Sequence, residues 1–266
     1  MHTLALTLDL AGAAIRSRMQ YRANFLMMVA FGLVYQTTGF VFIWTVLTRF
    51  ETIAGWTLGE ITFLYGLRLV VHGLNTVLFG GVSRVRWQVR EGLFDRYLVR
   101  PVPPLLQVAA MELPAASFGD LLGGATLFLA ANALVGIDYS PVALGYLALA
   151  ISGGVLIEAA LQLIIATLSF RLIETGSLAF FVDELFSNFG NYPLKIFGGA
   201  AQAILTWVLP VAFVAYLPST VLLARTDELV VHPAVAYGAP VVGALWFAAA
   251  YLFWRRELRE YKSAGH

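Results

Sequence analysis

Long apolar runs separated by short polar stretches dominate the chain. A helix that crosses a bilayer needs about 20 mostly apolar residues, and runs of this length recur. We predict spans at 24–48, 61–82, 113–135, 142–170, 200–217 and 233–254. The intervals between them hold charges, prolines or turn residues, which are typical of connections. The pattern predicts an all-α integral membrane protein with six transmembrane helices in one domain, 1–266.

The stretch 177–199 fits this pattern poorly, because charged and amide residues and Pro193 interrupt its apolar residues. With six spans it is an amphipathic or re-entrant segment that leads into the fifth span. Were it a seventh span, it would place the C-terminus on the opposite side of the membrane. The basic cluster Arg255, Arg256, Arg259 and Lys262 would then lie outside, against the rule that basic residues stay on the cytoplasmic side. We therefore predict six spans.

Basic residues gather on one side of this arrangement. Only Arg49 and Arg225 fall on the other side, and Arg68 lies within a span. The asymmetry predicts that both termini are cytoplasmic. We expect a multi-pass protein of the inner (plasma) membrane of the cell. The residues on the cytoplasmic side are Arg16, Arg18, Arg22, Arg84, Arg86, Arg90, Arg96, Arg100, Arg171, Lys195, Arg255, Arg256, Arg259 and Lys262.

The first 23 residues predict a helix that lies in the cytoplasmic interface. Leu4, Leu8, Ile15 and Met19 recur at helical spacing, which favours an amphipathic helix with its apolar side in the lipid. The basic residues follow the first apolar residues, whereas a cleavable signal carries them first. The alternative is a frayed terminus without regular structure.

Composition agrees with the membrane class and excludes several kinds of chemistry. Charged residues make up 12% of the chain, against roughly 25% in a soluble domain. The absence of cysteine excludes thiol catalysis and Cys-ligated metal sites. The chain has no GxxxxGK[ST], HExxH or GxSxG motif, and its four histidines are scattered. We therefore predict no catalytic residues, no metal site and no cofactor bound by this chain, and no nucleic-acid partner.

Ionisable and amide side chains inside the spans are the candidates for function, because charge in the bilayer core is costly. Arg68, His72 and Asn75 share one face of the second predicted span. Glu158 shares a face of the fourth span with Gln162, and Asp120 lies in the third. One interpretation is a polar lining for a translocation path. The other is structural: Arg68 pairs with Glu158 or Asp120 to hold helices together, or extends to the interface.

Four glycine pairs favour close helix packing, with hinges as the alternative. They are Gly80-Gly81, Gly123-Gly124, Gly153-Gly154 and Gly198-Gly199.

The cytoplasmic connection 84–104 between the second and third spans carries large apolar residues among charges. This favours a short helix, stopped by prolines, that docks into a groove on a partner. Leu93 and Phe94 are the expected anchors, and Gly92 would allow either a close backbone approach or a bend between two short turns. Arg90, Glu91, Asp95 and Arg96 would form a charged rim that sets orientation. The alternative is a helix that lies on the membrane surface.

Two stretches resemble a known family. The sequence REGLFD at 90–95, followed by LVRP at 98–101, resembles the coupling segment of type-2 ABC transporter permeases. The stretches YPLKIF at 192–197 and ILTWVLPVAFVAYLP at 204–218 are similar to a pattern of one bacterial branch of these permeases. The resemblance covers nearly the whole chain in length, span count and order. It implies six helices with an N-terminal elbow helix, a cytoplasmic coupling helix and a small extracellular hairpin within 218–232.

The resemblance implies the transmembrane subunit of an ATP-binding cassette exporter, not an enzyme in its own right. ATP and Mg²⁺ would bind a separate cytoplasmic ATPase subunit. A second permease copy or a paralogue would complete the dimer within the membrane lipid. The alternative is an ATP-independent polytopic protein, either a small secondary transporter or an assembly factor. Secondary transporters often show internal repeats, and none is evident here.

Overall fold

The computed structural model describes residues 12, 21–49, 51–111, 114–137, 139–172 and 174–262. This part of the chain is helical and contains no strand. The predicted interfacial helix 1–23 lies almost entirely outside it. The main helices are α2 (Arg22–Arg49), α3 (Leu58–Phe79), α4 (Val85–Arg90), α5 (Pro104–Met111), α6 (Ala116–Val135), α7 (Pro141–Leu168), α8 (Gly176–Phe189), α9 (Gly199–Ala203), α10 (Tyr216–Leu222) and α11 (Ala239–Glu260).

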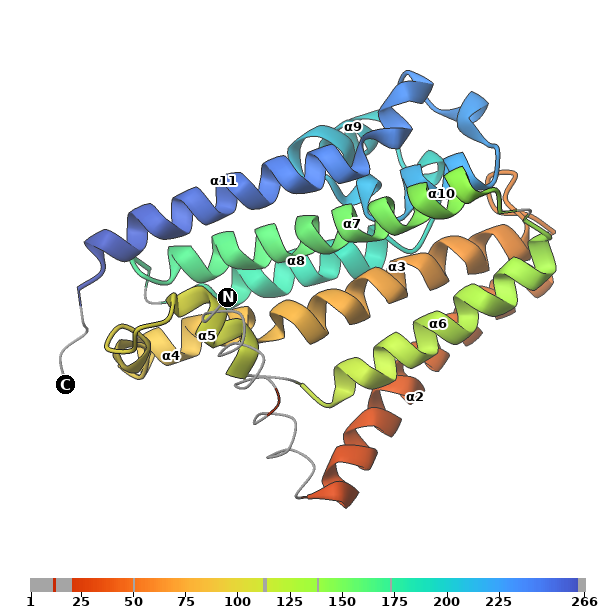
Figure 1. The fold of residues 1–266 in the computed structure, drawn as a ribbon. Coiled ribbons are helices and arrows are strands. Elements are labelled where there is room, and N and C mark those ends of the chain that lie inside the picture. Colours follow the sequence, from red (N-terminus) through yellow and green to blue (C-terminus); the bar gives the residue numbers. More distant parts are fainter. Residues whose placement is uncertain are drawn as a thin grey trace.

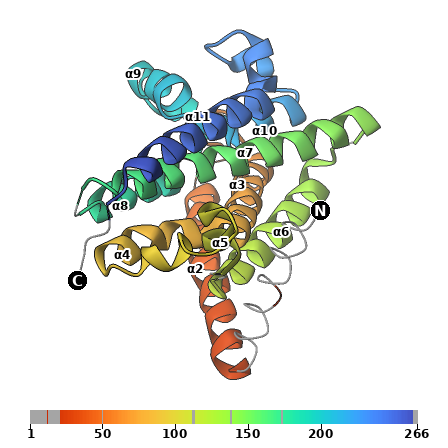
Figure 2. The same ribbon diagram turned by 60° about the vertical axis from the view of Figure 1, so that its left-hand side comes forward.

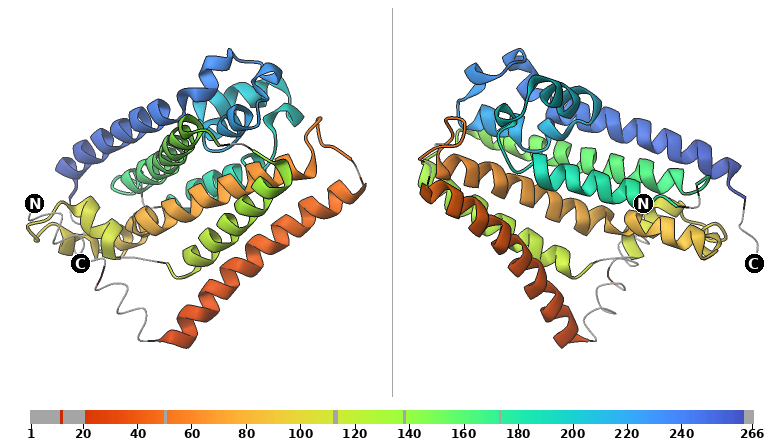
Figure 3. Two further views of the ribbon diagram at one scale, coloured as in Figure 1. Left: turned by 45° about the vertical axis from the view of Figure 1, so that its right-hand side comes forward. Right: turned by 180° about the vertical axis from the view of Figure 1, so that it is seen from behind.

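The long helices form a row in which α11 packs on α7, α7 on α3, α3 on α6, and α6 on α2 (Figure 1). The helix α8 lies against α7, and α2 is at the edge of the bundle (Figures 2 and 3). We call the end that carries Arg90 and Arg171 the basic end. The opposite end, which carries Glu60 and Arg225, is the hairpin end.

Five helices among the described residues are long and apolar enough to cross a membrane. They coincide with the predicted spans 24–48, 61–82, 113–135, 142–170 and 233–254, and the all-α membrane class is confirmed. Local signals set their ends. Thr57 and Glu60 form a capping box at the start of α3. Ser140 caps α7 ahead of Pro141, and Gly136 ends α6 with a left-handed backbone (φ 68°).

Glycines allow the long helices to touch backbone to backbone, as predicted for several of the pairs. A Cβ at Gly153 of α7 would lie 2.5 Å from the carbonyl carbon of Ala239 in α11. A Cβ at Gly124 of α6 would lie 2.6 Å from Cβ of Leu69 in α3. The prediction is wrong for Gly198 and Gly199, where a Cβ would meet nothing within 4 Å.

The predicted fifth span, 200–217, is instead a hairpin that enters and leaves at one end of the bundle. Its two parts, Gly199–Val208 and Val211–Leu222, are bent by 76°. Lys195, just before the hairpin, and Arg225, just after it, both contact Glu228. The Lys195 Nζ to Glu228 Oε2 distance is 3.7 Å, and Arg225 Nη1 lies 3.4 Å from the same oxygen. The pair is therefore re-entrant and does not cross the bundle.

The segment that was predicted to be amphipathic or re-entrant, 177–199, contains the actual crossing. Arg90 Nη1 lies 3.7 Å from Glu174 at the basic end, just before α8. Lys195, just after α8, lies at the hairpin end. The chain thus crosses the bundle between these residues. The prediction that Lys195 lies on the same side as Arg171 is therefore wrong. The chain still makes six passages, so α2 begins and α11 ends at the basic end.

This corrected path can be tested directly, because the chain has no cysteine of its own. We expect Gly198→Cys and Asp227→Cys, both at exposed positions, to react with a membrane-impermeant maleimide from one side. Leu172→Cys, which is 46% exposed, should react only from the other side. If Gly198→Cys and Leu172→Cys react from the same side, the crossing is misplaced.

Candidate functional site

The connection predicted to couple to a partner begins as a continuation of the second span. The helix α3 passes through η1 (Gly80–Arg84) into α4, so that Leu58–Arg90 forms one long element. Gly92 then turns the chain with a positive φ of 67°, which glycine adopts without steric cost. The backbone thus bends at Gly92, which is one of the two roles that the sequence suggests for it. A push on this connection therefore acts directly on α3.

Two buried glutamines hold the connection in place. Gln88 Nε2 donates to Tyr97 Oη at 3.0 Å. Gln107 Nε2 donates to the carbonyl oxygens of Tyr97 at 2.9 Å and Val102 at 2.6 Å. Tyr97 belongs to η2 (Phe94–Tyr97), so these bonds fix η2 against α4 on one side and α5 on the other. Satisfied buried hydrogen bonds of this kind fix one local conformation.

Phe94, predicted to be a docking anchor, is fully buried. Its ring centroid lies 5.2 Å from that of Phe170, 5.9 Å from that of Trp254 and 5.5 Å from that of Tyr261. These residues come from the ends of α7 and α11, so Phe94 joins the connection to both helices. The prediction that Phe94 anchors a partner is wrong, because no surface of it is left to bind one.

The connection keeps an exposed apolar surface, and Leu93 belongs to it as predicted. We define the connection face as Leu93 (38% exposed), Leu98 (43%) and Val99 (84%). Arg90, Glu91 and Arg96 are exposed among these residues, and Asp95 is half-buried. Arg90 also pairs with Glu91 at 3.3 Å. An apolar surface with charged neighbours is typical of a site that binds another protein.

An ion pair network joins α7 and α11 beside this aromatic cluster. Arg171 donates to both carboxylate oxygens of Glu257, and its Nη2 lies 2.6 Å from Oε2 of Glu260. The hydrogen bond with Glu257 raises the pKa of Arg171. Burial, with the Asp95 carboxylate nearby, raises the pKa of Tyr261 to about 12. Both groups therefore keep their protons at neutral pH.

A polar cavity of about 290 Å³ lies between α2, α3, α7 and α8. His72 Nδ1 lies 3.1 Å from Oε2 of Glu158. Arg68 and Glu158 are 4% and 3% exposed. The structure thus gathers polar groups from four helices around one space. The lining residues are Tyr35, Gln36, Arg68, His72, Thr76, Ser83, Glu158, Gln162, Val182, Asp183, Phe186 and Ser187.

The ion pair predicted for Arg68 does not form. Glu158 contacts His72, and Asp120 accepts a hydrogen bond from Gln36 Nε2 at 2.8 Å. No ion pair of Arg68 with either carboxylate occurs in the described part of the chain, and Arg68 Nε has no hydrogen-bond partner there. Asn75 is fully buried and does not line the cavity. The cavity therefore gathers Arg68, His72 and Glu158 but excludes Asn75 and Asp120.

Sequence reasoning did not single out Asp183 or Gln36 as members of this site. Asp183 is exposed in the described chain and lines the cavity from α8. Gln36 is 6% exposed and lies on α2. A glutamine within an otherwise apolar span is the sequence signal that points to it.

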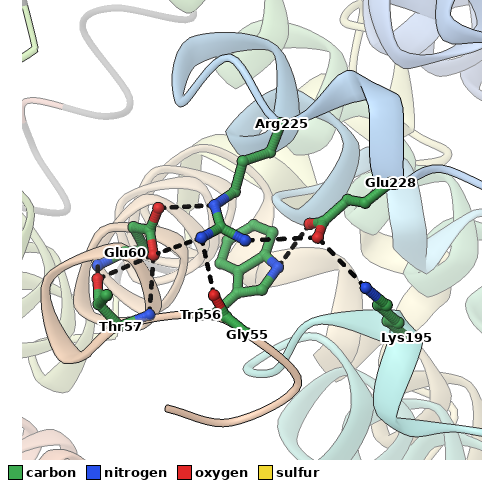
Figure 4. Close-up of polar contacts among 7 residues, drawn as sticks. All are labelled: Gly55, Trp56, Thr57, Glu60, Lys195, Arg225 and Glu228. Atoms are coloured by element: carbon green, nitrogen blue, oxygen red, sulfur yellow. Dashed lines mark hydrogen bonds and ion pairs between the residues drawn. The ribbon is translucent and has the colours of Figure 1, made fainter. Parts of the chain in front are cut away.

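At the hairpin end, Arg225 links the start of α3 to the loop that follows the hairpin (Figure 4). Its Nε and Nη2 lie 2.6 and 3.1 Å from the two carboxylate oxygens of Glu60, and Nη2 donates to the Gly55 carbonyl at 2.8 Å. Trp56 Nε1 donates to Glu228 Oε1 at 2.6 Å. A bidentate arginine is the strongest form of such a link. The network holds the loop after the re-entrant hairpin on top of α3.

None of these sites has the residues for metal chemistry: the described residues contain no group of three or more His, Asp or Glu that could hold a metal ion. The arrangement instead combines a transmembrane bundle, a polar cavity within it and an exposed connection at one end.

Comparison with protein families identifies the family to which this chain belongs. Residues 33–265 match the family model described as ABC-2 family transporter protein. Neither the comparison with curated proteins nor that with solved structures gave a significant match. Members of this permease family are membrane subunits that associate with an ATP-binding cassette subunit. The match covers most of the chain, so this protein belongs to the ABC-2 family of transporter proteins, as a multi-pass permease.

Proposed function

We propose that this chain is the membrane subunit of an ATP-driven exporter and that a cytoplasmic ATPase subunit docks on the connection face. The observation that carries this proposal is the exposed apolar set Leu93, Leu98 and Val99 at the basic end. Basic residues concentrate at this end, which favours the cytoplasmic side. ATP and Mg²⁺ would then bind the partner, since this chain has no phosphate-binding loop.

The packing behind the connection face supports a role in transmitting motion. Phe94 directly follows Leu93 and packs on Phe170 and Trp254. Leu58–Arg90 is one long element, so a displacement of the connection acts on α3 as well. The helices α3 and α7, which line the polar cavity, and α11, which packs on α7, are therefore joined to one surface patch. An ATPase that moved this patch would move α3, α7 and α11 together.

The dimer required for transport would be completed by a second copy or a paralogue, in the membrane lipid. The cavity supports a translocation path. It places Arg68, Glu158 and His72 inside the bundle, where charged groups lose their hydration at a high cost in free energy. A role in transport explains this cost better than helix packing does. In this proposal both termini are cytoplasmic.

Substitution of the connection face tests the docking directly. We expect Leu93→Asp combined with Val99→Asp to leave the permease inserted and monodisperse. Co-purification of the ATPase should fall to background, because a carboxylate in an apolar contact is left desolvated and unpaired. The measurement is the ratio of ATPase to permease after affinity purification in mild detergent from cells that express both.

Val230→Asp provides the matched control, since Val230 is 85% exposed but lies at the hairpin end. It should retain the ATPase at the wild-type ratio. Full retention by the Leu93/Val99 variant would refute docking on this face and favour the alternative in which the segment lies on the membrane. Absence of any ATPase from the wild-type protein would favour an ATP-independent protein.

A further inference from the structure

Three polar atoms on residues that line the cavity have no hydrogen-bond partner within the described protein. They are Arg68 Nε, Glu158 Oε1 and Gln162 Oε1. Arg68 and Glu158 are both more than nine-tenths buried. Buried polar groups are normally paired, and an unpaired charged group is especially costly. These three atoms have almost no accessible surface, so they mark charged and amide groups beside the cavity whose hydrogen bonding the described protein leaves incomplete.

The charges on the cavity walls are of both signs. Arg68 carries a fixed positive charge on α3. Glu158 on α7 lines the cavity and contacts His72 through Oε2. Asp183 on α8 adds a second carboxylate. A ligand that complements both signs carries a negative group for Arg68 and a positive, hydrogen-bond-donating group for Glu158 and Asp183.

We propose that the cavity binds a zwitterionic group of the transported molecule, with a phosphate or carboxylate at Arg68 and a primary ammonium at Glu158, Gln162 and Asp183. The inference rests on the proposed transport function and adds a substrate class to it. A primary ammonium supplies three N–H donors, which match these acceptors. A quaternary ammonium has none and could donate no hydrogen bond to the carboxylates of Glu158 and Asp183.

The rest of the cavity fits a head group with an apolar attachment. Tyr35, Val182 and Phe186 line it beside the charged groups. Its volume of about 290 Å³ is at the lower end of the roughly 300–1,000 Å³ found for small-molecule pockets. It therefore holds a head group, while an apolar part of the ligand remains outside it.

The test measures binding of short-chain lipids and a soluble head group to the purified permease by native mass spectrometry. The probes are dioctanoyl phosphatidylethanolamine, dioctanoyl phosphatidylcholine, dioctanoyl phosphatidylglycerol and glycerophosphoethanolamine. We expect the ethanolamine lipid to bind more tightly than the choline and glycerol lipids. Arg68→Gln and Glu158→Gln should each weaken that binding by roughly tenfold, the effect of losing one charge-assisted hydrogen bond.

Matched controls separate the cavity from general charge effects. Arg255→Gln and Glu184→Gln remove an exposed arginine and an exposed glutamate elsewhere, and both should bind like the wild type. Where Arg68→Gln fails to fold, Arg68→Lys keeps the charge but loses the planar donor set, and its binding should still weaken. Equal binding by the cavity variants and the controls, or no preference for the ethanolamine lipid, would overturn the proposal.

The soluble probe identifies the source of the ligand. Equal competition by glycerophosphoethanolamine would indicate a free zwitterion, whereas binding of the diacyl form alone would indicate a molecule taken from the membrane; each supports the zwitterionic site. The measurement needs no ATPase. Its failure therefore leaves the docking experiment on Leu93 and Val99 unaffected, and the two hypotheses fail separately.

Discussion

Replacing Phe94 by alanine is expected to destabilise the whole basic end of the permease. Its ring is fully buried against Phe170, Trp254 and Tyr261. Deleting a buried phenylalanine side chain costs about 3–5 kcal/mol, because the cavity left behind does not collapse fully. We expect a lower midpoint of thermal aggregation and a lower yield of monodisperse protein. Phe94→Asp should be worse, since it adds a buried carboxylate.

The neighbouring position supplies the control. Leu93 is 38% exposed, so Leu93→Ala should leave the aggregation midpoint close to that of the wild type while weakening ATPase retention. The two substitutions thus separate stability from docking at adjacent residues. A Phe94→Ala protein with wild-type stability and no bound ATPase would show that Phe94 is an anchor after all.

Replacing Gly153 by alanine is the second change with a large expected effect. The added Cβ would lie 2.5 Å from the carbonyl carbon of Ala239 and still closer to its oxygen. These are backbone atoms, so α7 and α11 must move apart along their shared interface. Overpacking of this kind typically costs about 1–3 kcal/mol and occasionally more. We expect a lower aggregation midpoint and loss of transport.

Gly145→Ala is the matched control on the same helix. A Cβ there meets nothing within 4 Å, and alanine is the better helix former by roughly 1 kcal/mol. This variant should be as stable as the wild type or more so. If both alanine variants behave alike, the contact between α7 and α11 is looser than the structure indicates.

Hydropathy predicted the five helices that have long apolar runs and failed for α8 and for the stretch 200–217. The spans α2, α3, α6, α7 and α11 follow from long apolar runs. In α8, polar residues such as Asp183 line a cavity, so the average polarity resembles that of an interfacial helix. The stretch 200–217 is apolar because its second part, 211–217, is buried in the bundle, while Trp207 in its first part is 60% exposed. Composition alone does not separate these cases.

The burial of Phe94 could not be predicted from the sequence, for a different reason. An aromatic residue among charges is typical of a docking surface, and nothing near Phe94 in the sequence indicates otherwise. Its partners Phe170, Trp254 and Tyr261 come from the ends of two distant helices. Leu93, which lacks such partners, remained exposed. Local pattern therefore located the connection but did not determine which of its side chains face outward.

The cavity was predicted in part. The shared face of Arg68 and His72, and that of Glu158 and Gln162, follow from helical spacing, and all four residues line the space. The predicted partners of Arg68 were wrong because Glu158 contacts His72 and Asp120 accepts from Gln36, and spacing within one helix does not determine contacts between helices. Asp183 was missed because its place beside the cavity depends on the crossing by α8, which hydropathy did not predict.

The link between Arg225 and Glu60 has a consequence for how the protein is made. The two residues are 165 positions apart in the chain. Synthesis proceeds at about 5–20 residues per second, so Arg225 is translated roughly 8–30 s after Glu60. Meanwhile Thr57, whose backbone N–H and Oγ1 both donate to Glu60 at 2.8 Å, gives the carboxylate a local partner. The hairpin end is thus completed only late in biogenesis, when the segment containing Arg225 reaches it.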